Sequence, residues 1–190
     1  MKKQTTWTNI MLDIETMGKE PNSAILTIGA SLFRQNALGI VEINPDLFYS
    51  RVELADSVRN GSVDGETLRW WLSQSSESLA ELVNPDRYLL KVCLQGLSSF
   101  INKNCNPSKV LVWANSPSFD CTILESAYKR FDMEKPWEYY NQRCYRTMKG
   151  LFNVAKPEIE NNVKHHAADD ALMQVEHLKL IVEKQKIIIG

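Results

Sequence analysis

Two carboxylates stand two positions apart near the start of the chain, in the segment DIET from Asp13 to Thr16. Alternate side chains of a β-strand point to the same face, so Asp13 and Glu15 would face the same way at the end of a strand. One metal ion could then bind both carboxylates. The pattern Asp-x-Glu is common, however, and by itself it more often marks a solvated strand end than a site.

Two further acids occur where helices are expected to begin: Asp120 follows VLVWANSPSF, and Asp170 follows HHAAD. Carboxylates from separate elements can converge where the strand ends of a sheet meet the helices packed on it. Four grouped acids would raise one another's pKa unless cations neutralised them. Oxygen ligands of this kind favour Mg²⁺ or Mn²⁺. For Asp120 alone, the alternative is a helix N-terminal acid stabilised by the helix dipole.

His165 and His166 precede Asp170 by five and four positions. Five helical positions differ by roughly 140° around the axis, so His165 and Asp170 cannot share a helix face, and His165 is expected in the loop before the helix. A loop imidazole with an ordinary pKa near 6.5 can take a proton from a water molecule at neutral pH. The alternative is that the two histidines cap the helix or bond to the core.

The elements that must position these residues follow from the hydrophobic pattern, which predicts strands first and then alternating strands and helices. Strands are expected at residues 9–14, 23–33, 47–54, 109–114 and 142–148. Helices are expected from residue 64, at 88–101, at 119–131 with Ser118 as the cap, and at 168–184, and residues 151–162 are expected to be irregular. The first two strands suggest a hairpin. This order predicts an α/β fold with a mixed sheet.

Composition predicts one globular domain over residues 1–190, since 44% of the residues are hydrophobic and 24% are charged. A net charge of −1 argues against a protein that coats nucleic acid through bulk positive charge. The N-terminal residues resemble neither a signal peptide nor a lipid anchor, and no apolar run is long enough for a membrane helix, so we expect a cytoplasmic protein without a membrane partner. The spacing of the four cysteines indicates neither zinc nor redox chemistry.

The segments DIET, NSPSFD and HHAADDA, in this order and over nearly the whole chain, resemble the three motifs of the DEDDh exonucleases in the RNase-H-like superfamily. The RWW and RCYRT segments resemble the small single-domain exonucleases of phages and bacteria within that group. This resemblance implies an RNase-H-like exonuclease fold, a central mixed β-sheet flanked by helices. It also implies a 3′-5′ exonuclease that uses two Mg²⁺ or Mn²⁺ ions and releases nucleoside 5′-monophosphates.

The same resemblance implies a role for each motif residue. Asp13 and Glu15 would bind both ions, Asp120 would serve the second ion, and Asp170 would complete the ligands of the first. His165 would deprotonate the attacking water. In a sister group of exonucleases a tyrosine base stands four residues before the last Asp, where this chain has His166. The five-residue spacing favours His165, and Asp169 is left without a role.

Five residues are candidates for substrate binding. The backbone around Thr16 and Met17 would form the pocket for the terminal nucleotide. Trp70 is a candidate for base stacking, although adjacent helical residues diverge by about 100°, so Trp70 or Trp71 is expected in the core. Arg143 and Arg146 would contact phosphate or serve as surface charge.

The expected partner is single-stranded nucleic acid with a free 3′ end, with DNA favoured over RNA from the phage-like resemblance. A homodimer is an open alternative to a monomer. Three rival hypotheses are a module that binds nucleic acid ends without cutting them, a phosphoesterase that acts on small nucleotides or dinucleotides, and an α/β domain whose acids are surface residues.

Overall fold

A mixed sheet forms the centre of the computed structural model, which describes residues 6–157 and 165–189. Within these residues, the sheet has six strands: five follow the order β3-β2-β1-β5-β6, and the sixth, β4, pairs with β2. The strands are β1 (Asn9–Thr16), β2 (Ile25–Gln35), β3 (Val41–Ile43), β4 (Phe48–Arg51), β5 (Leu111–Ala114) and β6 (Gln142–Cys144). β1 and β2 form the predicted antiparallel hairpin, whereas β5 runs parallel to both β1 and β6.

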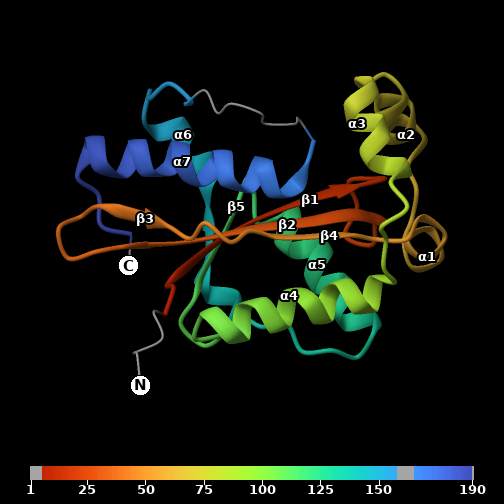
Figure 1. The fold of residues 1–190 in the computed structure, drawn as a ribbon, viewed down its shortest axis with the longest axis horizontal. Helices are drawn as coiled ribbons and strands as arrows, with labels where there is room; N and C mark the ends of the chain where they lie inside the picture. Colours follow the sequence, from red (N-terminus) through yellow and green to blue (C-terminus); the bar gives the residue numbers. More distant parts are fainter. Residues whose placement is uncertain (1–5, 158–164, 190) are drawn as a thin grey trace.

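Helices cover both faces of this sheet, with α6 and α7 on one side and α4 and α5 on the other (Figure 1). Three short helices, α1 to α3, gather at the end of the sheet toward which β1 points. The helices are α1 (Leu54–Asn60), α2 (Gly65–Leu72), α3 (Ser76–Val83), α4 (Leu90–Asn104), α5 (Asp120–Arg130), a 3₁₀ turn (Tyr139–Asn141), α6 (Tyr145–Leu151) and α7 (Ala167–Gln185). No helix in the described part of the chain is both long enough and apolar enough to cross a membrane.

The alternation of side chains along β1 divides the core into two layers. Ile10, Leu12 and Ile14 pack with α4 and α5, whereas Met11 packs with α7. Asp13 and Glu15 continue the series of Met11, so they face the α7 side of the sheet. Alternation therefore directs the two acids toward the helix that carries Asp170.

The last predicted strand, residues 142–148, was too long. Only Gln142–Cys144 pairs in the sheet, and α6 begins at Tyr145. Tyr145 is buried, and its hydroxyl lies 2.6 Å from Nδ1 of His177 on α7. Met148, three residues further along, packs in the same cluster, which is the spacing of a helix face rather than a strand.

Other element boundaries also differ from the predictions. The expected strand at 47–54 shortens to Phe48–Arg51, because Leu54 already begins α1. Ser118 does not cap α5: Phe119 occupies the cap position, and the Ser118 hydroxyl instead lies 2.6 Å from that of Ser116. The short elements β3, α1 and α3 were not predicted. Of the expected irregular segment 151–162, residues 158–162 lie outside the described residues.

Candidate active site

Asp13 and Glu15 lie at the end of β1, where the register with β2 shifts between Glu15 and Thr16. A shift of this kind ends regular pairing and is common beside active sites. Asp13 pairs across the strands with Gly29 of β2. A side chain at Gly29 would overlap the backbone of Ala167 and Ala168. The missing side chain thus lets the first turn of α7 lie directly on the sheet.

Asp120 approaches the same place from β5 and α5. It is the first residue of α5, it is only 4% exposed, and its Oδ1 accepts a hydrogen bond from the Ile14 backbone N–H at 3.3 Å. Because β5 runs parallel to β1, the segment that follows β5 reaches the same edge of the sheet as the end of β1. Asp120 is therefore both a helix N-terminal acid and a neighbour of the Asp13 and Glu15 pair.

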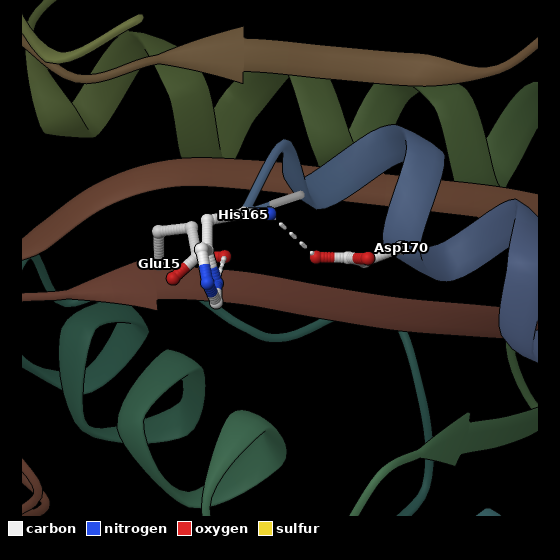
Figure 2. A group of neighbouring side chains, drawn as sticks. All are labelled: Glu15, His165 and Asp170. Atoms are coloured by element: carbon white, nitrogen blue, oxygen red, sulfur yellow. Dashed lines mark hydrogen bonds and ion pairs between the residues drawn. The ribbon is translucent and has the colours of Figure 1, made fainter. Parts of the chain in front are cut away.

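His165 lies immediately before α7, as predicted, and adopts a left-handed backbone conformation with φ of 64°. Its backbone N–H donates to Asp170 Oδ2 at 3.1 Å, shown by the dashed line in Figure 2. Its Nδ1 atom lies 3.8 Å from Glu15 Oε1. The imidazole ring packs edge-on against the Trp70 ring, with the ring centroids 4.8 Å apart.

His166 has a different environment. Its ring packs on Tyr49, with the ring centroids 3.9 Å apart. Its Nδ1 accepts the Asp169 N–H at 3.4 Å and so caps α7. Capping, which the sequence offered as one alternative for the pair, thus applies to His166, whereas His165 approaches the acids.

The pKa values of the acids show how closely the four side chains are grouped. The pKa of Asp13 is raised well above its usual value by burial and then by the charges of Asp120, Glu15 and Asp170. Burial, followed by the charges of Asp170 and Asp120, raises the pKa of Glu15 to about 8. Burial also raises the pKa of Asp120 to about 7 and, to a smaller extent, that of Asp170. Without a cation, the site therefore resists full ionisation.

A cavity of about 320 Å³ contains all four acids and His165. Arg146, which was predicted as a substrate-binding residue, also lines this cavity. The other lining residues that the structure describes were not predicted for the site: Ile14, Asn115, Phe119, Tyr145, Lys156, Met173 and Gln174. Asn115 and Phe119 belong to the NSPSFD segment and Tyr145 to RCYRT, so those motifs were the signal that could have identified them. Gln174 follows Asp170 by four residues on α7, a spacing that places both on one helix face.

A larger cavity of about 870 Å³ adjoins the first and shares Ile14, Glu15, Phe119 and Arg146 with it. Trp70 lines this cavity and is 42% exposed, whereas Trp71 is 1% exposed and belongs to the core, so the two tryptophans divide as predicted. The Trp71 indole N–H donates to the Thr16 backbone oxygen at 3.0 Å.

The remaining predicted substrate residues have separate environments. Thr16 also lines the larger cavity, and its hydroxyl donates to the Gly18 oxygen at 2.6 Å. Met17 packs against the cluster around Trp71 instead. Arg146 lines both cavities and donates to the Asn115 backbone oxygen at 3.0 Å. Arg143 lines neither cavity, and its guanidinium donates to the backbone oxygens of Tyr140 and Gln142.

The donor set fits a divalent metal ion. Ligand atoms of Glu15, His165 and Asp170 all lie within 4.8 Å of one another (Figure 2). Two further carboxylates are close to this group: the charge of the buried Asp120 acts on Glu15, and Asp13 is affected by the charges of Asp120, Glu15 and Asp170. Carboxylate oxygens are the ligands that Mg²⁺ and Mn²⁺ prefer, and a cation would offset the repulsion between these acids.

Comparison with known proteins identifies a family whose model matches most of this chain. The model of the family described as the 3′-5′ exoribonuclease Rv2179c-like domain matches residues 8–182. No curated protein matches the chain.

Solved structures share the fold at low sequence identity. Exonuclease X in complex with 5′ overhanging duplex DNA is 13% identical with a TM-score of 0.56, over 94% of this chain and 93% of that one. The nuclease domain of 3′hExo, a DEDDh family member bound to rAMP, is 12% identical with a TM-score of 0.57, over 95% and 93% of the chains. Cell-death related nuclease 4 is also 12% identical, with a TM-score of 0.55, over 94% of this chain and 64% of its own. The RNase-H-like exonuclease fold expected from the sequence is confirmed.

Proposed function

The chain belongs to the 3′-5′ exoribonuclease Rv2179c-like family and is a 3′-5′ exonuclease, and from this premise we propose how it binds and cleaves its substrate. In our proposal it removes nucleoside 5′-monophosphates from the 3′ end of single-stranded nucleic acid, with two Mg²⁺ or Mn²⁺ ions. The observation that carries the proposal is the grouping of Asp13, Glu15, Asp120, Asp170 and His165 around one cavity.

The four carboxylates would hold the ions. Asp13 and Glu15 would be shared between both ions, Asp170 would serve the first and Asp120 the second. When bound, such ions stabilise the charge that develops on the attacking and leaving oxygens of the phosphodiester. The raised pKa values of Asp13 and Glu15, caused by burial and the neighbouring acids, support this role, since these groups gain most from a nearby cation.

His165 would act as the general base. Its imidazole would take a proton from the attacking water as the water oxygen bonds to phosphorus and the bond from phosphorus to the 3′ oxygen breaks. The leaving 3′ oxygen would then take a proton from solvent. Support comes from the 3.8 Å separation of Nδ1 from Glu15 and from the backbone bond to Asp170, which tie this imidazole to the acids.

The terminal nucleotide would occupy the larger cavity, with its scissile phosphate toward the acids. Trp70 is exposed along this cavity and offers a ring on which a base could stack. The backbone near Thr16 and Met17 would contact the terminal sugar. Arg146, which lines both cavities, would contact the phosphate. Arg143 stays a proposed phosphate contact outside both cavities.

The proposal includes a preference for DNA over RNA. The resemblance of the motifs to phage enzymes favoured DNA, whereas the description of the family names RNA as the substrate. Matched DNA and RNA oligonucleotides, single- and double-stranded and blocked at either end, would be digested in parallel with each metal ion. Faster degradation of RNA would overturn the DNA preference.

A cytoplasmic location also belongs to this proposal.

The decisive variant for the enzyme itself is Asp13→Ala. Loss of a shared ligand should abolish hydrolysis while the protein remains folded, because the substitution also relieves repulsion among the acids. Cleavage of a labelled oligonucleotide and thermal unfolding would be measured together, with Asp46→Asn, at an exposed acid, as the control. Unaltered cleavage by Asp13→Ala would contradict the assignment. Substrates of graded length would separate an exonuclease, which yields a ladder, from a phosphoesterase of small nucleotides.

A further inference from the structure

Gln174, which has no role in the mechanism above, makes a direct contact with Asp13. Its Nε2 donates to Asp13 Oδ1 at 2.6 Å across the interface between α7 and β1. The residue is 3% exposed and lines the cavity that holds the four acids. The bond therefore holds one oxygen of the Asp13 carboxylate in a fixed position relative to α7.

The other end of the same amide has an unmet requirement. Gln174 Oε1 is buried and accepts no hydrogen bond from the residues that the structure describes. When Asp13 holds an ion, its carboxylate is ionised and can only accept a hydrogen bond, so the amide nitrogen must face Asp13 and the amide oxygen is left on the other side. A buried acceptor without a partner costs free energy, so this oxygen calls for a donor. A water molecule is the smallest donor that the shared cavity could admit.

We propose that Gln174 is a positioning residue for the ion-binding group, and this inference rests on the proposed function. Its Nε2 fixes the orientation of the Asp13 carboxylate before an ion binds, and its Oε1 accepts a hydrogen bond from a water molecule that enters the cavity with the ion. Groups that orient metal ligands in this way typically contribute about 10- to 100-fold to metal affinity or activity.

The test compares metal affinity with the stability of the metal-free protein. Gln174→Met keeps the length of the side chain and removes both polar atoms. We expect the Kd for Mn²⁺, measured by calorimetry without substrate, to rise about 10- to 100-fold. The unfolding temperature in EDTA should stay the same or rise, since the unpaired oxygen is gone. A lower unfolding temperature with the parental Kd would identify a purely structural role and overturn the proposal.

A matched control comes from the same kind of bond elsewhere in the molecule. Gln142 Nε2 donates to Glu125 Oε1 at 2.7 Å, and neither residue lines the two cavities described above. Gln142→Met should leave the Kd for Mn²⁺ at the parental value. If both variants weakened Mn²⁺ binding equally, the effect would not be specific to Gln174, and the proposal would fail.

Asp13→Ala separates this inference from the proposed function. If Gln174 acts through Asp13, adding Gln174→Met to Asp13→Ala should weaken Mn²⁺ binding less than it does in the parent. Should Asp13→Ala itself leave Mn²⁺ binding unchanged, the metal assignment fails; should only Gln174→Met be without effect, the inference alone fails. If Gln174→Met does not fold, Gln174→Ala, which introduces no clash, provides the same comparison.

Discussion

The groups around Glu15 have opposite effects on the stability of its ionised carboxylate. Asp170 and Asp120 raise its pKa, whereas His165 stands within 3.8 Å and would stabilise its negative charge when protonated. A divalent ion would offset the repulsion far more strongly than one imidazole can. The residue therefore connects the metal-binding and base functions proposed for the site, and substitutions around it should separate the two functions.

His165→Ala should lower kcat by about 10² to 10⁴-fold, the usual contribution of a general base, with Mn²⁺ affinity close to that of the parent. Single-turnover cleavage and Mn²⁺ calorimetry would be measured on the same protein. His166→Ala is the matched control, since its ring packs on Tyr49 and its nitrogen caps α7. A large loss of Mn²⁺ affinity in His165→Ala would instead make that histidine a metal ligand.

Stability of the metal-free protein should fall as the pH rises. The pKa of Glu15 is raised from 4.5 to about 8 and that of Asp120 from 3.8 to about 7. Between these limits the folded state binds more protons than the unfolded state, so the free energy of unfolding decreases from about pH 4 to about pH 8. Urea unfolding in EDTA would measure the decrease.

Two comparisons check the origin of this pH dependence. Glu15→Gln should reduce the decrease, because its side chain cannot ionise, and Asp46→Asn should leave it unchanged. Saturating Mg²⁺ should raise stability most at the upper end of the range, where the acids are ionised. A metal-free protein that became more stable between pH 5 and 8 would contradict the burial of these acids.

At the scale of elements, the site depends on how closely α7 lies on the sheet. Gly29 leaves room for the backbone of Ala167 and Ala168, and the same first turn carries Asp170 and follows His165. A Cβ at position 29 would therefore displace Asp170 and His165 through the backbone of α7, without contacting either side chain. His165, with its left-handed backbone conformation, lies two residues before the first residue of α7.

Gly29→Ala should displace the start of α7, cost about 1–3 kcal/mol of stability as an overpacked substitution, and reduce activity strongly. Gly150→Ala is the control, because nothing lies within 4 Å of a Cβ at that position and the residue is within α6. We expect that variant to be as stable as the parent or more so, with full activity. Denaturant unfolding and oligonucleotide cleavage would be measured for both. Full activity in Gly29→Ala would show that the site tolerates a shift of α7.

At the scale of the whole molecule, net charge and the position of the cations limit how the protein holds its substrate. The net charge is −1, and Lys19, Arg146 and Lys156 line the two cavities. These three side chains can neutralise only a few phosphates. Affinity for a single strand should therefore depend mainly on the terminal nucleotide, with little contribution from distant phosphates.

The logarithm of the affinity for single strands should fall with the logarithm of salt concentration with a slope of about −2, as three phosphate contacts would give. Titrations in Ca²⁺, with fluorescent oligonucleotides at several salt concentrations, would measure it. Arg146→Gln should reduce the slope, whereas Arg59→Gln, at a side chain that is 72% exposed and lines neither cavity, should not. A slope near −5 would indicate a much longer row of basic residues than the two cavities contain.

Unfolding in a single transition would support one domain over residues 1–190, and sedimentation would test for a homodimer.

The sequence by itself predicted the framework of this protein and the residue types of its candidate site. Apolar periodicity predicted the β1–β2 hairpin, the central strand β5 and the helices α4, α5 and α7, because buried faces repeat at fixed spacings along the chain. The same patterns predicted that Asp13 and Glu15 share one face of a strand and that His165 lies in the loop before a helix. These features depend on local geometry, which neighbouring residues specify.

Only the tertiary structure decided which side chains meet. The approach of α7 over Gly29, the contact of Gln174 with Asp13 over 161 positions of sequence and the packing of His166 on Tyr49 join distant segments. The helix at Tyr145 replaced part of a predicted strand because its partner is His177 of α7. Such contacts depend on three-dimensional packing, which no local pattern encodes, and this is why the acids were predictable as types while their geometry was not.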